Sequence, residues 1–276
     1  MHISKNLNEK KIVILLPFIL LCISMFIKQS ALNGQEAFKP GKWIKLFNGK
    51  NLDGWAVKIA YHPLNENSRN TFRVENGIMK ACYDNYDSLR NEFGHIFYKH
   101  KFSSYRIRVE YRFTGELTPG SPEWDYRNSG IMIHSQSPES MEVNQEFPVS
   151  IEVQLLGGNG KDERTTANVC TPGTNIVINK ELITRHITNS TSKTYHGDQW
   201  VTVEVEVHGN RSVKHIIDGV TVLEYQNPQL DETDPYAKKL LAKGQPLMLS
   251  DGYIALQAEG HPVEFRNVEI FILEEK

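Results

Sequence analysis

The stretch VSIEVQLLGG, residues 149–158, places two polar side chains where they could act on a ligand. Apolar residues at every second position alternate with Glu152 and Gln154, which is the pattern of a strand with one apolar and one polar face. A carboxylate and a carboxamide one pleat apart would bind hydroxyl groups, and the carboxylate would also transfer protons. The alternative is an ordinary half-solvated strand, since alternation also places acidic residues on inert surfaces.

Two further strands carry polar side chains in the same phase. In YRIRVEYRF the side opposite the apolar residues bears Glu110 and Arg112, and in NSGIMIHS it bears Asn128 and His134. If the apolar sides face the core, all of these polar side chains point away from it. They would converge with Glu152 on one shared surface if the strands are neighbours in a sheet.

The residue types at these positions predict different roles. Glu152 is the candidate for proton transfer, and Gln154 would orient a hydroxyl group or Glu152 itself, because an amide does not exchange protons near neutral pH. Arg112 would clamp an oxygen atom or keep Glu152 ionised, since an adjacent cation lowers the pKa of a carboxyl group. The alternative for Glu110 and Arg112 is a cross-strand ion-pair network, which we favour for the two other arginines of that strand.

Three histidines and two aspartates bear on acid–base or metal chemistry. His95, His134 and His261 could each be an acid, a base or a metal ligand, although single histidines are more often structural. The chain lacks a His-x-Glu-x-x-His spacing, so a zinc site has little support, and we predict no metal ligand. A calcium site built from loop carbonyls with Asp162 or Asp251 stays open, and the sequence identifies no cofactor.

The elements that must position these residues are short strands. About a dozen alternating segments are separated by turn signals such as Asn76-Gly77 and Asp218-Gly219, which suit two-residue hairpins. Residues 157–167 have the Gly, Asn and charged content of an exposed loop. Long amphipathic helices are absent, and PYAKKLLAK predicts one helical turn. The pattern predicts an all-β antiparallel sandwich.

Composition limits the classes of partner. The 276 residues are 39% hydrophobic and 23% charged, which is enough apolar material for one substantial core. The formal net charge of -2 gives no reason to expect nucleic acid or an anionic membrane surface as a partner. Oligomeric state is not predicted.

The N-terminus predicts export. Lys10 and Lys11 precede a sixteen-residue apolar run, residues 12–27, which is short for a membrane span and typical of a secretory signal. We expect a signal peptide over residues 1–34, a mature domain over residues 42–274, and a periplasmic or cell-surface location. An uncleaved membrane anchor is the alternative. In that oxidising compartment Cys82 and Cys170 would either pair or lie buried as separate thiols.

Six motifs in a fixed order carry a family likeness. The motifs are WIKLFNGKNLDGW, FRVENGIM, VEYRF, NSGIMIH, IEVQLL and YIALQAEGHPVEFRNVEI. With these motifs in this order, the chain resembles the 3-keto-disaccharide hydrolase domain family over about residues 43–273.

The resemblance implies a concanavalin A-like jelly roll of two antiparallel sheets and a carbohydrate substrate oxidised at carbon 3. It implies hydrolysis of 3-keto-glycosides or hydration of the derived 3-keto-glycals. A non-catalytic sugar-binding domain and an ordinary glycan hydrolase are the alternatives. The strand that would carry the usual glucanase carboxylates has Glu152 but no second acid, so the two-carboxylate retaining mechanism cannot be drawn on that strand alone.

Carried over by position, the resemblance completes the predicted site. Its motifs fall on Glu110 with Arg112, on residues 128–131, on Glu152 with Gln154, on residues 256–257 and on residues 265–267. His134 and Glu259 stand where many members have an arginine and a histidine. We therefore expect catalytic roles for Glu152, Arg112 and His134, and substrate-binding roles for Glu110, Asn128, Gln154, Gln257 and Glu259.

Overall fold

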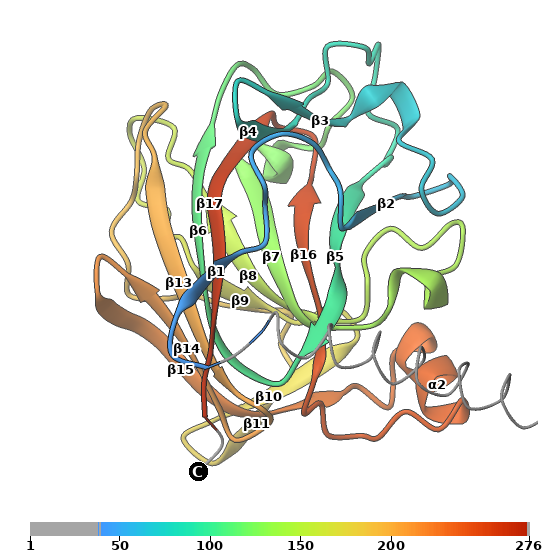
Figure 1. Cartoon of the computed structure of the whole chain (residues 1–276), viewed down its shortest axis with the longest axis vertical. Helices are drawn as coiled ribbons and strands as arrows, with labels where there is room; N and C mark the ends of the chain where they lie inside the picture. Colours follow the sequence, from blue (N-terminus) through green and yellow to red (C-terminus); the bar gives the residue numbers. More distant parts are fainter. Residues whose placement is uncertain (1–37, 39, 275–276) are drawn as a thin grey trace, which may run out of the picture. The chain divides into compact units, whose positions relative to one another are not determined.

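Alternating β-branched and aromatic residues fold into two antiparallel sheets that pack on each other across one apolar core (Figure 1). The computed structural model describes Phe38 and residues 40–274, and the chain from Gly41 onward forms one unit. The predicted signal peptide and its cleavage point lie outside the described residues. This architecture confirms the predicted all-β jelly-roll sandwich of two antiparallel sheets.

The larger sheet has ten strands, with β6 and β17 in its middle. In spatial order they are β11 (Glu181–Ile183), β10 (Thr174–Ile178), β15 (Val220–Leu230), β14 (Ser212–Ile217), β13 (Val201–His208), β6 (Ser104–Phe113), β17 (Val263–Ile272), β4 (Ile78–Ala81) and β3 (Phe72–Glu75), with β1 (Trp43–Lys45) also paired to β17.

The smaller sheet has seven strands and carries the VSIEVQLLGG segment at β8. In spatial order they are β12 (Ile187–Thr188), β9 (Asn168–Cys170), β8 (Ile151–Leu156), β7 (Asn128–Ser135), β16 (Gly252–Ala258), β5 (Gly94–Phe102) and β2 (Trp55–Ile59). In the part of the chain that the structure describes, three single-turn 3-10 helices lie in loops: η1 (Ser68–Asn70), η2 (Glu123–Asp125) and η3 (Pro138–Ser140).

The core lies between the sheets and is built by the apolar sides that the alternation predicts. Ile107 and Val109 of β6 and Ile151 and Val153 of β8 are all fully buried there. Each strand therefore turns its polar side away from the core, as side chains alternate along a strand. The outward faces of the two sheets consequently point in opposite directions.

Two-residue turns close the hairpins at the predicted positions. Asn76 and Gly77, with φ of 52° and 79°, join β3 to β4. Asp218 and Gly219, with φ of 51° and 79°, join β14 to β15. Positive φ at both turn positions favours Asn or Asp followed by Gly, which confirms the sequence-based reasoning.

The helix α2 (Pro235–Ala242) is longer than the single turn predicted from PYAKKLLAK. The side chain of Asp234 caps it by accepting hydrogen bonds from the backbone N–H groups of Tyr236 and Ala237, both at 2.8 Å. Its apolar side packs on a small cluster that includes Val149 and Leu249. Packing extends the helix beyond what its polar composition predicts.

Two further observations bear on the N-terminal and cysteine predictions. No helix among the described residues is long and apolar enough to cross a membrane. Cys82 is half-buried and Cys170 is buried, and both are free thiols. Of the two alternatives for these cysteines, the structure therefore has separate thiols.

Candidate active site

A cavity of about 490 Å³ lies on the outward face of the seven-stranded sheet, over strands β7, β8 and β9. Glu152, Gln154, Asn128 and Asn168 line its sheet side, and Glu259 lines it from the end of β16. A concave pocket of this size with a few convergent polar groups is the usual form of a small-molecule site.

Glu152 reaches the cavity because the neighbouring strand has a glycine beside it. Met132 of β7 pairs with Glu152, and the next outward position on β7 is Gly130, which pairs with Gln154. A Cβ atom built on Gly130 would lie 2.7 Å from Oε1 of Glu152. The Glu152 carboxyl group therefore lies over the Gly130 backbone, in the space that any side chain at position 130 would fill.

The two polar side chains of β8 differ in how they are held. The carboxyl oxygens of Glu152 have no hydrogen-bond partner among residues 40–274. Oε1 of Gln154, by contrast, accepts a hydrogen bond of 3.2 Å from Nδ2 of Asn168. Asn168 is itself fixed because its Oδ1 accepts from the backbone N–H of Ser190 at 2.9 Å and from Oγ1 of Thr165 at 2.7 Å. Gln154 is thus oriented, whereas Glu152 is free to bind a ligand.

Glu259 supplies the second carboxyl group of the cavity. It follows the last residue of β16, so strand β7 lies between it and the strand of Glu152. Its side chain is buried, and within the described part of the chain its Oε2 has no hydrogen-bond partner. The second acid that β8 lacks is therefore provided by another strand of the same sheet.

Burial disfavours the charged forms of both carboxyl groups. It raises the pKa of Glu152 above the ordinary range for a carboxyl group. Burial also raises the pKa of Glu259 well above its ordinary value, and the neighbouring charges of Glu152 and Asp125 add to the effect, while Arg164 opposes it. Near neutral pH the two carboxyl groups therefore hold at least one proton between them.

Further buried polar groups lie on β5 and β16 of the same sheet. His95 of β5 and Gln257 of β16 are paired in register and fully buried. Burial, with the charge of Lys58, lowers the pKa of His95 to about 3, so the ring is neutral. Both ring nitrogens of His95 and both amide atoms of Gln257 have no hydrogen-bond partner among the described residues. Asp125, whose pKa is raised by burial to about 7, is also fully buried, and its charge acts on Glu259.

Aromatic side chains form a wall of the cavity. Trp124 is 52% exposed and Phe147 is half-buried, and both line it. The ring of Phe93 supports them from behind, with centroids 5.7 Å from Trp124 and 5.0 Å from Phe147. An exposed aromatic face beside polar groups suits a ligand with both apolar C–H surfaces and hydroxyl groups.

Arg164 holds the Trp124 loop at the cavity. Its guanidinium group donates hydrogen bonds to the carbonyl oxygens of Trp124 at 3.4 Å, of Gly157 at 3.1 Å and of Tyr126. Nδ2 of Asn128 also donates to the Trp124 carbonyl, at 3.3 Å. The aromatic wall is therefore tied to the end of β8, on which the acid–base group lies.

The arrangement can carry out proton transfer in both directions. A carboxylate without hydrogen-bond donors is a good base, and a buried neighbour that keeps its proton is an acid. Pairs of buried, coupled carboxyl groups with raised pKa values are typical of acid–base catalysis.

Comparison with known families gives one match that covers most of the chain. Residues 42–271 match the family of the 3-keto-alpha-glucoside-1,2-lyase-like domain. The chain belongs to this family. No curated protein matches the sequence.

Solved structures share the fold at low sequence identity. A Parabacteroides distasonis protein described as a "putative glycosyl hydrolase" is 17% identical, with a TM-score of 0.50, and the match covers 84% of this chain and 94% of that one. A Bacillus subtilis protein of unknown function with a galectin-like fold is 11% identical, also with a TM-score of 0.50, over 87% of this chain and 100% of that one. These likenesses concern the jelly-roll fold. The family match itself indicates a glycosyl hydrolase-like or carbohydrate-binding domain.

The structure brings together part of the predicted site. Glu152, Gln154, Asn128 and Glu259 all line the cavity. Gln257 lies on the same outward face of the sheet and is fully buried, but it is not among the residues that line the cavity. Strand parity predicted the positions of Asn128, Glu152 and Gln154, and the family resemblance predicted those of Gln257 and Glu259. They come together because β7, β8 and β16 are neighbours.

Glu110 and Arg112 do not belong to this site, and the predicted shared surface is wrong for them. They lie on β6 in the other sheet, on its outward face. Glu110 accepts hydrogen bonds from Nε of Arg266 at 2.6 Å and from Nδ2 of Asn267 at 2.8 Å. Nε of Arg112 donates to Glu264 at 2.6 Å. Strand parity gave the correct side of β6 but could not tell which sheet contains the strand.

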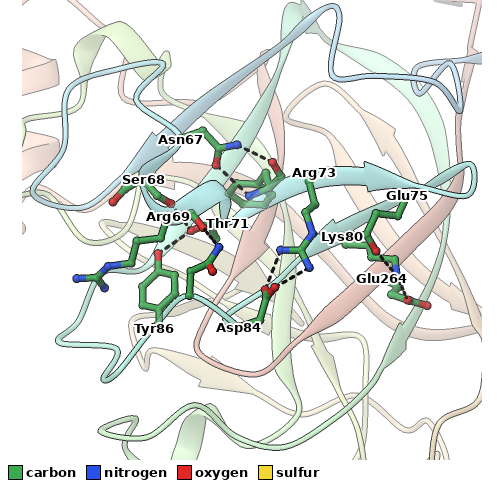
Figure 2. Close-up of polar contacts among 12 residues, drawn as sticks. Asn67, Ser68, Arg69, Thr71, Arg73, Glu75, Lys80, Asp84, Tyr86 and Glu264 are labelled. Atoms are coloured by element: carbon green, nitrogen blue, oxygen red, sulfur yellow. Dashed lines mark hydrogen bonds and ion pairs between the residues drawn. The ribbon is translucent and has the colours of Figure 1, made fainter.

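The outward face of the ten-stranded sheet is instead an ion-pair network. Figure 2 shows part of it, where Arg73 pairs with Asp84 at 2.7 Å and Lys80 pairs with Glu264 at 3.0 Å. Arg108 continues the network on β6 through Glu204 of β13, at 2.8 Å. The structure therefore has the cross-strand ion-pair network that was the alternative interpretation for Glu110 and Arg112.

His134 also lies away from the site. Strand β7 has one residue more than β16 between the pairs Ser135–Tyr253 and Met132–Ala255, so it bulges at this point. His134 has a φ of 49°, and its Nε2 lies 3.0 Å from the carbonyl oxygen of Gly209, after β13. A bulge breaks the alternation of side chains, and parity beyond it fails. His134 is therefore directed toward the other sheet and does not contact the cavity.

Four residues at the site were not predicted as functional. Arg164 and Asn168 lie in or just after the segment predicted to be an exposed loop, and Trp124 and Phe147 lie in loops before β7 and β8. Asn168 begins the short strand β9, and the alternation of side chains in its sequence, NVC, could have predicted that Asn168 points to the same side as Cys170. Trp124, Phe147 and Arg164 gave no periodic signal, because loops have no fixed parity.

No group of three or more His, Cys, Asp or Glu side chains among the described residues is arranged to hold a metal ion. The two aspartates considered for calcium have other partners: Asp162 accepts a hydrogen bond of 2.7 Å from Asn159, and Asp251 lies 3.6 Å from Lys101.

Proposed function

We propose that the chain is an exported carbohydrate-active enzyme that breaks the bond between carbon 1 and the leaving-group oxygen of a 3-keto-glycoside. The observation that carries this proposal is the pair Glu152 and Glu259. Both are buried in one cavity, and Glu152 has no hydrogen-bond partner among the described residues. Burying two carboxyl groups without internal partners destabilises the fold, and such pairs are typical of catalytic sites.

The chemistry needs only one base and one acid. The carbonyl at carbon 3 acidifies the proton on carbon 2, and Glu152 as carboxylate accepts that proton. The electron pair forms an enolate between carbons 2 and 3. When the carbonyl re-forms, a double bond forms between carbons 1 and 2, and the bond from carbon 1 to the leaving oxygen breaks. Glu259 donates its proton to that oxygen, so the products are a 3-keto-glycal and an alcohol.

The raised pKa values of the two neighbouring carboxyl groups support a shared role in proton transfer. Burial raises the pKa of both groups, and the charge on Glu152 raises that of Glu259 further. The group that ionises first is the base, and the group that keeps its proton is the acid. Hydration of the glycal is the same path in reverse, with water in place of the alcohol. Elimination followed by hydration gives net hydrolysis.

The remaining residues of the cavity would bind the sugar. Gln154, held by Asn168, presents an oriented amide to a hydroxyl group. Oδ1 of Asn128 is buried without a partner in residues 40–274 and is available as an acceptor. Trp124 and Phe147 would cover the C–H surface of the ring.

The test is to incubate the mature domain with 3-keto-glucosides and with the matching unoxidised glucosides, and to follow the products by NMR. We expect turnover of the 3-keto compounds only, with the glycal or 3-keto-glucose as product. Binding without turnover would support a sugar-binding domain, and turnover of plain glucosides would support an ordinary glycan hydrolase. A parallel reaction with a chelator tests for a metal requirement.

Export is part of the proposal and is supported by the lysine-flanked apolar run near the N-terminus. A periplasmic or cell-surface enzyme would meet glycosides before uptake. Fractionation of expressing cells, followed by detection of the protein in each fraction, tests this location.

A further inference from the structure

Cys170 faces the candidate active site from the strand beside Glu152. Strand β9 pairs with β8 in antiparallel register, and Cys170 lies directly opposite Glu152. Its neighbour Val169 pairs with Val153 and is buried in the core, so the Cys170 side chain points outward. Cys170 lines the cavity together with Glu152 and is only 2% exposed, which means that a ligand reaches the thiol through the cavity.

The thiol of Cys170 is free to react. Cys82 and Cys170 are both free thiols, and they lie in different sheets, since Cys82 follows β4 and Cys170 ends β9. Cys82 is half-buried and is not among the residues that line the cavity. Cys170 is therefore the thiol that the cavity presents to a ligand, and Cys82 is an internal control for it.

The carboxyl group of Glu152 is the second reactive group at this position. It is only 5% exposed and has no hydrogen-bond partner among residues 40–274. It lies over Gly130 on β7, which is the strand on the side of β8 away from β9. Directly opposite residues have Cβ atoms about 4.5–5.5 Å apart, so a carboxyl group that leans away leaves room above β8 in front of the thiol. A ring bound there would have the base on one side and the sulfur atom on the other.

The surroundings of Cys170 keep its thiol protonated. Burial raises the pKa of the thiol, and the charges of Glu152 and Glu259 raise it further. A protonated thiol is a weak nucleophile, and thiols of this kind react slowly with reagents from solvent. Reaction at Cys170 therefore needs a base that removes the thiol proton as the sulfur atom forms its bond. Glu152, directly opposite on β8, is that base.

A conjugated unsaturated ketone is the electrophile that suits this pair. In a 3-keto-glycal the double bond between carbons 1 and 2 is conjugated with the carbonyl at carbon 3, so carbon 1 accepts a nucleophile. The sulfur atom bonds to carbon 1 while Glu152 as carboxylate takes the thiol proton, directly or through one water molecule. The electron pair of the double bond moves into an enolate between carbons 2 and 3. Glu152 then returns the proton to carbon 2, which restores the carbonyl and leaves a thioether.

We propose that Cys170 is a nucleophile that captures 3-keto-glycals, and other cyclic conjugated ketones that enter the cavity, as reversible thioethers. That the glycal is the enzyme's own product rests on the proposed function. The reaction of Cys170 with an unsaturated ketone supplied from outside rests only on the placement of Cys170 and Glu152 in one cavity.

The first test supplies the electrophile directly and needs no turnover of a glycoside. The protein is incubated with dihydropyranone, the unsubstituted ring with the same conjugated ketone as the glycal, or with saturated tetrahydropyranone. Borohydride reduction of the ketone then fixes the thioether for intact-protein mass spectrometry and peptide mapping. We expect an adduct on Cys170 with the unsaturated ring only, and its loss when the protein is diluted before reduction. Absence of the adduct, or equally fast labelling of Cys82, would overturn the proposal.

The variant Glu152→Gln shows how the thiol is activated. It removes a negative charge near Cys170 and so lowers the pKa of the thiol, which would speed up labelling through a freely ionised thiol. Labelling that needs Glu152 as base should instead slow down by about a hundredfold or more. Cys170→Ala and Cys170→Ser should abolish the adduct, and Cys82→Ala is the matched control that keeps it. Faster labelling in Glu152→Gln, or an adduct that persists without Cys170, would contradict the proposal.

Turnover separates this inference from the proposed function. If no 3-keto-glucoside is turned over but Cys170 reacts with dihydropyranone through Glu152, the proposed reaction fails and the nucleophile is confirmed. If 3-keto-glucosides are turned over and Cys170 forms no adduct with either the glycal or dihydropyranone, the proposed function is supported and Cys170 is only a structural thiol.

Discussion

Replacing Glu152 by glutamine should lower activity and raise stability, because both effects follow from removing a buried, ionisable carboxyl group. The change keeps the shape of the side chain and removes the proton-transfer group. General base catalysis is typically worth about 10²–10⁴-fold, so single-turnover rates on a 3-keto-glycoside should fall by that order, while the dissociation constant changes little.

The stability effect follows from burial without a hydrogen bond. Burial raises the pKa of Glu152 from 4.5 to about 8. The folded chain therefore holds a proton that the unfolded chain has released, and stability falls as pH rises between these two values. Each such group lowers the free energy of unfolding by about 1.4 kcal/mol per pH unit in that range. Between about pH 6 and pH 8 the wild type should lose roughly 2 to 3 kcal/mol that Glu152→Gln does not lose.

Urea unfolding at these two pH values, together with single-turnover kinetics, measures both effects. Glu181→Gln on the exposed strand β11 is the control for the charge change alone. Near-native turnover in Glu152→Gln would remove Glu152 as the base. A pH dependence of stability equal to that of the wild type would show that its carboxyl group is not held in a desolvated site.

Three other predictions test the site, the corrected residues and the export signal. Gly130→Ala should reduce kcat by about tenfold or more while the protein stays folded, because the new methyl group displaces the Glu152 carboxyl group; circular dichroism with steady-state kinetics measures both. Arg112→Ala should leave kcat/KM within about twofold and cost about 1 kcal/mol or less in thermal unfolding, since it breaks a partly exposed ion pair with Glu264; a large loss of activity would return Arg112 to the site. Sequencing of the exported protein should find a new N-terminus near residues 31–35, and a chain that begins at Met1 would favour the anchor.

Much of the fold could be read from local patterns. The alternation in β6, β7 and β8 gave the correct inward and outward sides, because the strand period of two is set by backbone geometry. The turns at Asn76-Gly77 and Asp218-Gly219 followed from the need for positive φ. The length of α2 did not follow, because its stability comes from packing against residues distant in sequence.

The candidate site was predicted in part, and the errors have distinct physical causes. Glu110 and Arg112 were placed with Glu152 because all three side chains point away from the core. The outward faces of two stacked sheets, however, point in opposite directions. His134 was misplaced because a bulge changes the parity of one strand partway along it. Arg164 and Trp124 were missed because loop residues carry no periodic signal.

By itself the sequence determined the strands, the hairpin turns, the polarity of each face and the family, since each depends on neighbouring residues or on motif order. Only the tertiary structure decided that β16 lies two strands from β8 and so brings Glu259 to Glu152. Strand order within a sheet depends on which apolar faces pack together across the whole core. That choice is a property of long-range contacts, and no local pattern of residues encodes it.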